Sequence, residues 1–380
     1  MSFKNLGSFV TSQLFAPIAI GRLELANRLV VSPMCQYSAD DGSANAWHMM
    51  HLGMLANSGA SLLILEATAV EAAGRITTGC LGLYSDANEA ALQPVVEACR
   101  RFGNAKIGIQ LGHAGRKASS KRPWEGKTMS DPLEGGGWTT KAPSALAMGP
   151  GFQTPQSMSV AEIAHLKASF MESTRRADRL GLDLIELHGA HGYLLHQFLS
   201  PLSNQRTDQY GGSLVNRMRL PLEIFMAVRS VWPAAKPLGM RISAIDWVDG
   251  GVTIEDSIAL VNELKKLGCD FVDVSSGGID PSARITIGPG YQVPFAERIK
   301  RDTGMLTMAV GLIADAAQAE AIIAEGKADC VAAARAFLDD PHFGWHAAYK
   351  LGAIPTLPPQ YARVALKAWP PAAAQYGAKA

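Results

Sequence analysis

The chain has 380 residues with nearly balanced charge, 35 Lys and Arg against 34 Asp and Glu, and 48% hydrophobic residues. This composition suits a globular core and gives no net field that would attract nucleic acid or an anionic membrane. The five cysteines are an odd number without CxxC spacing, which favours reduced thiols over a disulfide framework. The chain shows neither an apolar run of about 18 residues nor an N-terminal secretory pattern. We therefore expect a cytoplasmic protein with no membrane or nucleic-acid partner.

Short apolar segments alternate with amphipathic ones along the chain, after a first segment (14–25) that predicts two short strands around Gly21. We expect that hairpin to cap the bottom of the fold. Near-continuous apolar runs are typical of strands buried on both faces. Eight strands are predicted, at 27–34, 60–68, 106–113, 182–190, 237–244, 269–276, 305–313 and 328–337. Helices are predicted at 48–58, 88–102, 160–180, 214–231, 254–267, 294–301 and 316–325.

Eight strands alternating with helices predict an α/β protein whose parallel sheet closes into a (β/α)8 TIM barrel. We assign one domain to residues 1–380, with the barrel at 14–352 and a C-terminal tail at 353–380. The irregular segment after strand three, 114–159, is long and rich in Gly, Pro and Trp. Loops of that length are often functional, and this one leaves the end of a barrel where active sites lie, so we expect a lid.

Polar residues at the carboxyl ends of the strands should gather at the barrel mouth. The histidine pair His188 and His191 follows strand four, and function is favoured over a structural role. A metal site would need Glu186 or His113 as a third ligand, which the spacing does not require, so we predict no metal. The mouth residues singled out are Ser32, Pro33, Met34, Cys35, Tyr37, Gln110, His113, His188, His191, Tyr193, Arg241 and Arg335.

The strongest physical argument for a ligand-binding site concerns two arginines. Arg241 lies within strand five, and a buried guanidinium is costly without an anionic partner. Gly311 closes strand seven and Arg335 closes strand eight, where barrels often bind phosphate, so they predict an anion pocket rather than a structural salt bridge. Cys35 would ordinarily be an inert core residue, and only its place at a strand end marks it for function.

Four segments resemble the Old Yellow Enzyme family, most closely its xenobiotic-reductase or thermophilic-like branch. The resemblance runs in order from about Leu14 to the C-terminus. It is carried by the segments at 32–37 (SPMCQY), 110–117 (QLGHAGRK), 188–193 (HGAHGY) and 204–213 (NQRTDQYGGS). It implies FMN as cofactor and NADPH or NADH as co-substrate, without deciding between the two nicotinamides.

The resemblance also implies roles for individual residues. Ser32, Pro33, Met34 and Ala67 would line the flavin ring, Gln110 and Arg241 would meet its pyrimidine edge, and Gly311, Ala334 and Arg335 would hold its phosphate. Cys35 would tune the flavin, Tyr37, His188 and His191 would bind substrate, and Tyr193 would donate a proton. Ala334 departs from the family's usual Gly, so its added methyl could shift that loop. Arg363 in the tail would cross into a neighbouring active site, which implies a homodimer or homotetramer.

The implied activity is that of an ene-reductase. It would transfer hydride from NAD(P)H through the flavin to the β-carbon of an enone, nitroalkene or maleimide, while Tyr193 protonates the α-carbon. A non-catalytic flavin-binding barrel and a metal- or Schiff-base-dependent barrel lyase are the alternatives. The lyase would need a Lys within a late strand or a carboxylate-rich metal cluster, and the strand interiors offer neither.

Overall fold

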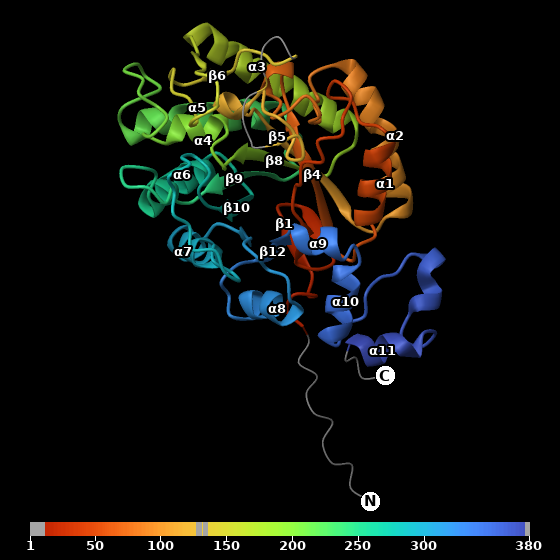
Figure 1. Cartoon of the computed structure of the whole chain (residues 1–380). Helices are drawn as coiled ribbons and strands as arrows, with labels where there is room; N and C mark the ends of the chain where they lie inside the picture. The colour runs from red at the N-terminus through yellow and green to blue at the C-terminus, as the bar shows by residue number, and fades with distance from the viewer. Residues whose placement is uncertain (1–11, 127–130, 132–135, 377–380) are drawn as a thin grey trace, which may run out of the picture.

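The computed structural model describes residues 12–126, 131 and 136–376. Within these residues eight parallel strands close into a barrel in the order β10-β11-β12-β3-β4-β5-β8-β9, with helices arranged around them (Figure 1). The predicted (β/α)8 barrel is confirmed. Its strands are β3 (Leu29–Val31), β4 (Leu62–Ala69), β5 (Lys106–Gly112), β8 (Leu184–Gly189), β9 (Leu238–Ser243), β10 (Phe271–Ser275), β11 (Thr307–Ala309) and β12 (Cys330–Ala333).

The surrounding helices begin at residues suited to capping. Ser159 and Thr253 each form a capping box with the acidic residue three positions later, which satisfies free N–H groups at the helix start. The main helices are α1 (Ala46–Leu55), α2 (Asp86–Phe102), α3 (Val160–Arg179), α5 (Leu214–Val231), α6 (Ile254–Lys266), α7 (Val293–Thr303) and α8 (Ala316–Ala324). Shorter elements are η1 (Ala72–Gly74), η2 (Gly115–Lys117), α4 (Leu194–Leu199), α9 (Arg335–Asp339), α10 (Phe343–Lys350), η4 (Pro359–Val364) and α11 (Pro370–Tyr376).

The N-terminal hairpin closes one end of the barrel, as predicted. Strands β1 (Ile18–Ile20) and β2 (Leu23–Leu25) pair antiparallel around Gly21, whose φ of +56° suits glycine. Ile20 and Leu25 join the apolar cluster inside the barrel, whose other buried members are Val30, Leu62, Ile64, Leu184, Phe271, Met308, Val310, Cys330 and Ala332.

Several boundaries differ from the predictions. The strand predicted at 305–313 ends at Ala309, so Gly311 follows strand seven rather than closing it. The strand predicted at 328–337 ends at Ala333, and Arg335 is the first residue of α9 rather than part of a strand. The backbone turns at Ala334, with φ −114° and ψ −83°. The segment 114–159 is also not wholly irregular, because η2 follows β5 and β6 (Lys141–Ala142) pairs in parallel with β7 (Gln156–Ser157). Residues 127–130 and 132–135 of that predicted lid lie outside the described residues.

Candidate active site at the barrel mouth

A cavity of about 230 Å³ opens beside the ends of β11 and β12. Gly311 lines it with a φ of +116°, which side chains rarely adopt. Arg335 also lines it, is exposed, and forms no ion pair with a carboxylate in the described part of the chain. A guanidinium left without a partner at a cavity suits an anion such as phosphate. Ala334 reaches its conformation at negative φ, so its backbone does not require the glycine usual there.

The predicted cofactor residues from other strands line or adjoin the same mouth. Ser32, which follows β3, lines the cavity with Arg241, and its buried Oγ has no hydrogen-bond partner among the described residues. Pro33 and Met34 come next in the chain and are partly buried. Ala67 follows a register shift in β4 and pairs with Gln110 of β5. An orphaned hydroxyl and an unpaired guanidinium are features that a bound polar cofactor would satisfy.

A layer of ionisable side chains lies inside the barrel next to this mouth. Gln110 Nε2 donates to Glu186 Oε1 at 2.7 Å, and Arg241 Nε lies 3.3 Å from Asp273 Oδ2. Burial, followed by the neighbouring charge of Asp273, raises the pKa of Glu186 to about 8. The sequence marks Glu186 only as a possible metal ligand and does not single out Asp273, although a buried Arg241 requires an anionic partner.

The three predicted substrate-binding residues of strand four lie together. The His188 ring centroid is 5.2 Å from that of His191 and 4.8 Å from that of Tyr193. His191 Nε2 also lies 2.7 Å from Ser275 Oγ. Burial, and then the charge of Arg241, holds the pKa of both imidazoles well below the ordinary value. Burial likewise raises the pKa of Tyr193 well above its ordinary value, so at neutral pH the site presents two neutral imidazoles and a protonated phenol.

The turn that carries these side chains is held in an unusual backbone conformation. His191 has φ 58° and Gly192 has φ 72°, and a Cβ on Gly192 would lie 2.0 Å from the carbonyl oxygen of Gly278. The His191 amide donates to Ser243 Oγ at 2.9 Å. Lys117 Nζ donates to the carbonyl oxygens of His191 at 2.6 Å and Gly278 at 3.2 Å. The turn is therefore fixed by residues from three other segments of the barrel.

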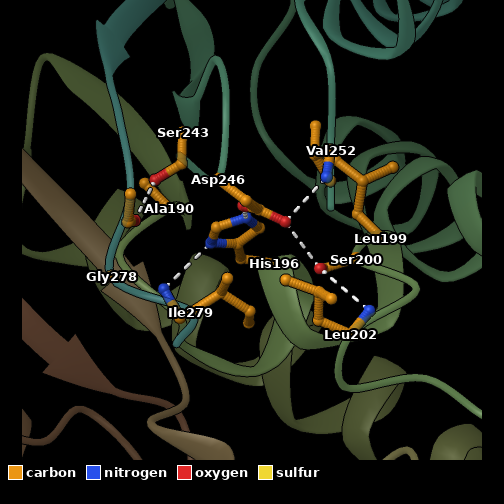
Figure 2. A network of polar contacts seen from close by, with 12 residues as sticks. Ala190, His196, Leu199, Ser200, Leu202, Ser243, Asp246, Val252, Gly278 and Ile279 are labelled. Carbon is orange, nitrogen blue, oxygen red and sulfur yellow. Dashed lines mark hydrogen bonds and ion pairs between the residues drawn. The ribbon is translucent and has the colours of Figure 1, made fainter. Parts of the chain in front are cut away.

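A buried network below the turn supplies a further anchor (Figure 2). The Gly192 amide donates to His196 Nδ1 at 2.9 Å, and His196 Nε2 lies 2.8 Å from Asp246 Oδ1. Asp246 Oδ2 accepts from Ser200 Oγ at 2.6 Å and from the Val252 amide at 2.7 Å. Burial alone would raise the pKa of Asp246, but His196, Ser200 and Val252 hold it below the ordinary value.

These supporting residues are not predicted from the sequence. Asp246 follows the end of a predicted strand, which is the signal that could have singled it out. Lys117 was part of a recognised motif without an assigned role. Its ammonium lies 4.9 Å from the centre of the Tyr193 ring, and burial, together with the charge of Arg116, lowers its pKa to about 8.

Cys35 is half-buried and lies beside the buried thiol of Cys80. A hydrogen bond with Cys80, and then burial, raises the pKa of Cys35 well above its ordinary value, so the thiol is neutral. Tyr37, which has φ 53°, also has its pKa raised by burial and by these two thiols. A neutral thiol is a poor nucleophile, which agrees with a tuning role for Cys35. Cys80, which the sequence does not single out, is its hydrogen-bond partner.

The remaining predictions concern metal and the tail. No group of three or more His, Cys, Asp or Glu placed to hold a metal ion occurs in the described ranges. His113 instead accepts from the Gly115 amide at Nδ1 and lies 3.7 Å from Glu71 through Nε2. Arg363 is exposed in η4, and the C-terminal elements α10 and α11 lie to one side of the barrel (Figure 1). Over the residues with described structure, no helix is both long and apolar enough to cross a bilayer.

Comparison with known proteins agrees with this geometry. Residues 13–353 match the model of the NADH:flavin oxidoreductase / NADH oxidase family. The chain is 44% identical over 354 residues to an NADPH dehydrogenase of Geobacillus sp. (strain WCH70), covering 93% of this chain and 98% of the relative. It is 43% identical over 353 residues to an NADPH dehydrogenase of Bacillus subtilis (strain 168), covering 92% and 98%. The solved structure of morphinone reductase superposes with a TM-score of 0.76 at 28% identity, covering 93% of this chain and 92% of that one.

A closed parallel barrel with a cavity at its mouth and these relatives define a flavin-dependent oxidoreductase. The chain belongs to the NADH:flavin oxidoreductase / NADH oxidase family, the Old Yellow Enzyme family. It is an enzyme that uses FMN and takes its electrons from a nicotinamide.

Proposed function

We propose that this enzyme reduces carbon–carbon double bonds that are activated by a neighbouring carbonyl or nitro group. The observation that carries the proposal is the trio of His188, His191 and Tyr193. The ring centroid of His188 lies 5.2 Å from that of His191 and 4.8 Å from that of Tyr193. Neutral imidazoles can donate hydrogen bonds to a substrate oxygen without binding it as a fixed ion pair. A phenol with a raised pKa keeps its proton until a strongly basic carbon forms beside it.

We propose the FMN site from the residues that line or adjoin the cavity at the barrel mouth. Arg335 and Gly311 would bind the phosphate, Gln110 and Arg241 would face the pyrimidine edge, and Pro33, Met34 and Ala67 would flank the ring. When bound, FMN supplies the two-electron transfer between nicotinamide and alkene.

The side chains of the mouth perform the remaining chemistry. His188 and His191 hold the substrate oxygen, and their hydrogen bonds strengthen as negative charge grows on that oxygen, so they stabilise the transition state more than the bound substrate. Tyr193 gives its proton from Oη to the α-carbon. Tyr37 contacts the substrate, and Cys35 adjusts the potential of the flavin.

The proposal also includes the substrates, the cellular compartment and the oligomeric state of the enzyme. Enones, nitroalkenes and maleimides are the substrates that fit two oxygen-directed donors. The five free thiols suit a reducing, cytoplasmic compartment. Arg363 would enter the site of a second copy, which makes the working unit a homodimer or homotetramer.

The test separates the two half-reactions. The purified protein should be yellow and release FMN on heating. In anaerobic stopped-flow measurements, the double variant His188→Ala, His191→Ala should still be reduced by NADPH. Its reoxidation by cyclohexenone should slow by at least about 10²–10³, the usual loss for one oxyanion donor.

His165→Ala provides the matched control, because the His165 side chain is 75% exposed on α3. Unchanged reoxidation in the double variant would reject the assignment of the histidines. A protein that binds FMN, reacts with NADPH and reduces no activated alkene would instead be a flavin-binding barrel without ene-reductase activity.

A further inference from the structure

The barrel interior contains a layer of polar and charged groups between the mouth and the apolar cluster that includes Ile20 and Leu25. Consecutive barrel strands contribute Gln110 (β5), Glu186 (β8), Arg241 (β9) and Asp273 (β10). Alternate residues of a strand face the same side, and Leu184 of β8 and Phe271 of β10 belong to the interior cluster. Glu186 and Asp273, two residues further along, therefore also face the interior.

The charges in this layer do not balance when both carboxylates are ionised. Among the residues with described structure, Arg241 is the only cation that acts on Glu186 and Asp273, and the groups acting on Glu186 are Asp273, Arg241 and the uncharged Gln110. Both carboxylates are fully buried. Glu186 Oε2 and both oxygens of Asp273 accept no hydrogen bond within the described structure. Because an unneutralised buried carboxylate is costly, such a pair retains a proton near neutral pH.

We propose that Glu186 and Asp273 form a shared proton store for the flavin. This inference rests on the proposed FMN site, in which Arg241 faces the pyrimidine edge. Reduction delivers two electrons and one proton to the neutral ring and so leaves one negative charge beside Arg241. That charge offsets the positive field of Arg241, the only group that favours ionisation of both carboxylates. At a pH near 8 or above, where the oxidised protein has lost the proton of the pair, the pair then takes up one proton from solvent, and releases it when substrate removes the two electrons and one proton.

Neighbouring groups do not replace the pair in this role. His188, two residues along β8, stays neutral, because burial and the charge of Arg241 hold its pKa well below the ordinary value. Gln110 cannot take up a proton. Its side chain donates a hydrogen bond of 2.7 Å to Glu186, and so connects the pair to the proposed pyrimidine edge of the flavin. The function inferred for Glu186 is to limit the charge that accumulates in the barrel.

The experiment counts protons taken up per flavin during anaerobic photoreduction in weakly buffered solution with a pH indicator. Wild type should take up more protons than Glu186→Gln, with the difference near zero at pH 6 and approaching one above pH 8. Redox-induced infrared difference spectra should show a protonated carboxyl signal that Glu186→Gln loses. Glu263→Gln, the same change at a surface position on α6, should behave as wild type.

Asp273→Asn tests the pair through its other member. With one carboxylate removed, Arg241 should keep Glu186 ionised in both redox states, so the extra proton should disappear although Glu186 is present. A yellow Glu186→Gln protein that takes up as many protons as wild type at pH 8.5 would overturn the proposal. A wild-type protein that binds no FMN would overturn the proposed function and this inference with it, so the two failures are distinguishable.

Discussion

Replacing Asp246 by Asn tests whether the network below the catalytic turn controls both stability and reactivity. Asp246 accepts hydrogen bonds from His196, Ser200 and the Val252 amide, all buried. An amide has one acceptor oxygen where the carboxylate has two. If that oxygen serves Ser200 and Val252, the amide nitrogen faces His196 Nε2, and the imidazole must move its proton to Nδ1. That proton would then point at the Gly192 amide, which donates to Nδ1 in the native protein.

Either orientation of the new amide leaves a buried donor without an acceptor. One unsatisfied buried donor costs about 1–3 kcal/mol, and hydrogen bonds to a charged group contribute about 1.5–3 kcal/mol each. We therefore expect Asp246→Asn to lower the free energy of unfolding by about 2–5 kcal/mol, out of the roughly 5–15 kcal/mol typical of a folded protein. The turn bearing His191 and Tyr193 should also loosen, so reoxidation by enone should slow while reduction by NADPH changes little.

Urea unfolding followed by tryptophan fluorescence measures the first effect and stopped-flow reoxidation the second. The pKa of Asp246 is depressed in the folded protein, so its stabilisation is present above the ordinary value of 3.8 and is lost as the pH falls through the folded value. The difference in the free energy of unfolding between wild type and Asp246→Asn should therefore become smaller below about pH 4. Asp249→Asn, an exposed change in the same loop, is the control. A loss of less than about 0.5 kcal/mol, the range of ordinary surface changes, would refute the reasoning.

Three further substitutions test the cofactor and substrate assignments. Arg335→Ala should raise the Kd of the apoprotein for FMN about 10- to 100-fold, the equivalent of one charged contact, and an unchanged Kd in a fluorescence titration would remove Arg335 from the phosphate site. Cys35→Ala should change the flavin potential in a dye-coupled titration, and also substrate affinity, while activity remains; an inactive variant with FMN bound normally would point to a covalent role instead. Tyr193→Phe should slow reoxidation by cyclohexenone and leave reduction by NADPH unchanged, and full activity would mean that the proton comes from another group.

The sequence predicts the barrel well because each strand is a local apolar run buried on both faces. Its errors fall at strand ends, as at Arg335, where an apolar run continues into a helix and periodicity alone cannot place the boundary. The β6–β7 pair was missed for a different reason. Each of its strands has only two residues, too few to produce a pattern.

The residues of the site also fall into those that the sequence predicts and those that it does not. Residues at or just after strand ends, such as His188 near the end of β8 and Tyr193 after it, could be predicted because the barrel brings all strand ends to one mouth. Their supports could not, because the pairs lie far apart in the chain: Gln110 and Glu186 are separated by 76 positions, and His196 and Asp246 by 50. Asp273 lies opposite Arg241 because β10 pairs in parallel with β9 in that register, and the register is not evident from the sequence.

Arg363 supplies the last test, because its role depends on a second copy of the chain. It is exposed in η4, and a guanidinium suits a site in a neighbouring subunit because it is planar, permanently charged and donates several hydrogen bonds. If it enters that site, Arg363→Ala should raise KM for enones with little change in the rate of reduction by NADPH. Lys367→Ala removes a similar exposed charge four residues later and should leave KM unchanged. An active monomer at assay concentration in analytical ultracentrifugation would exclude the role, since a residue in the tail of one chain could then complete no other chain's site.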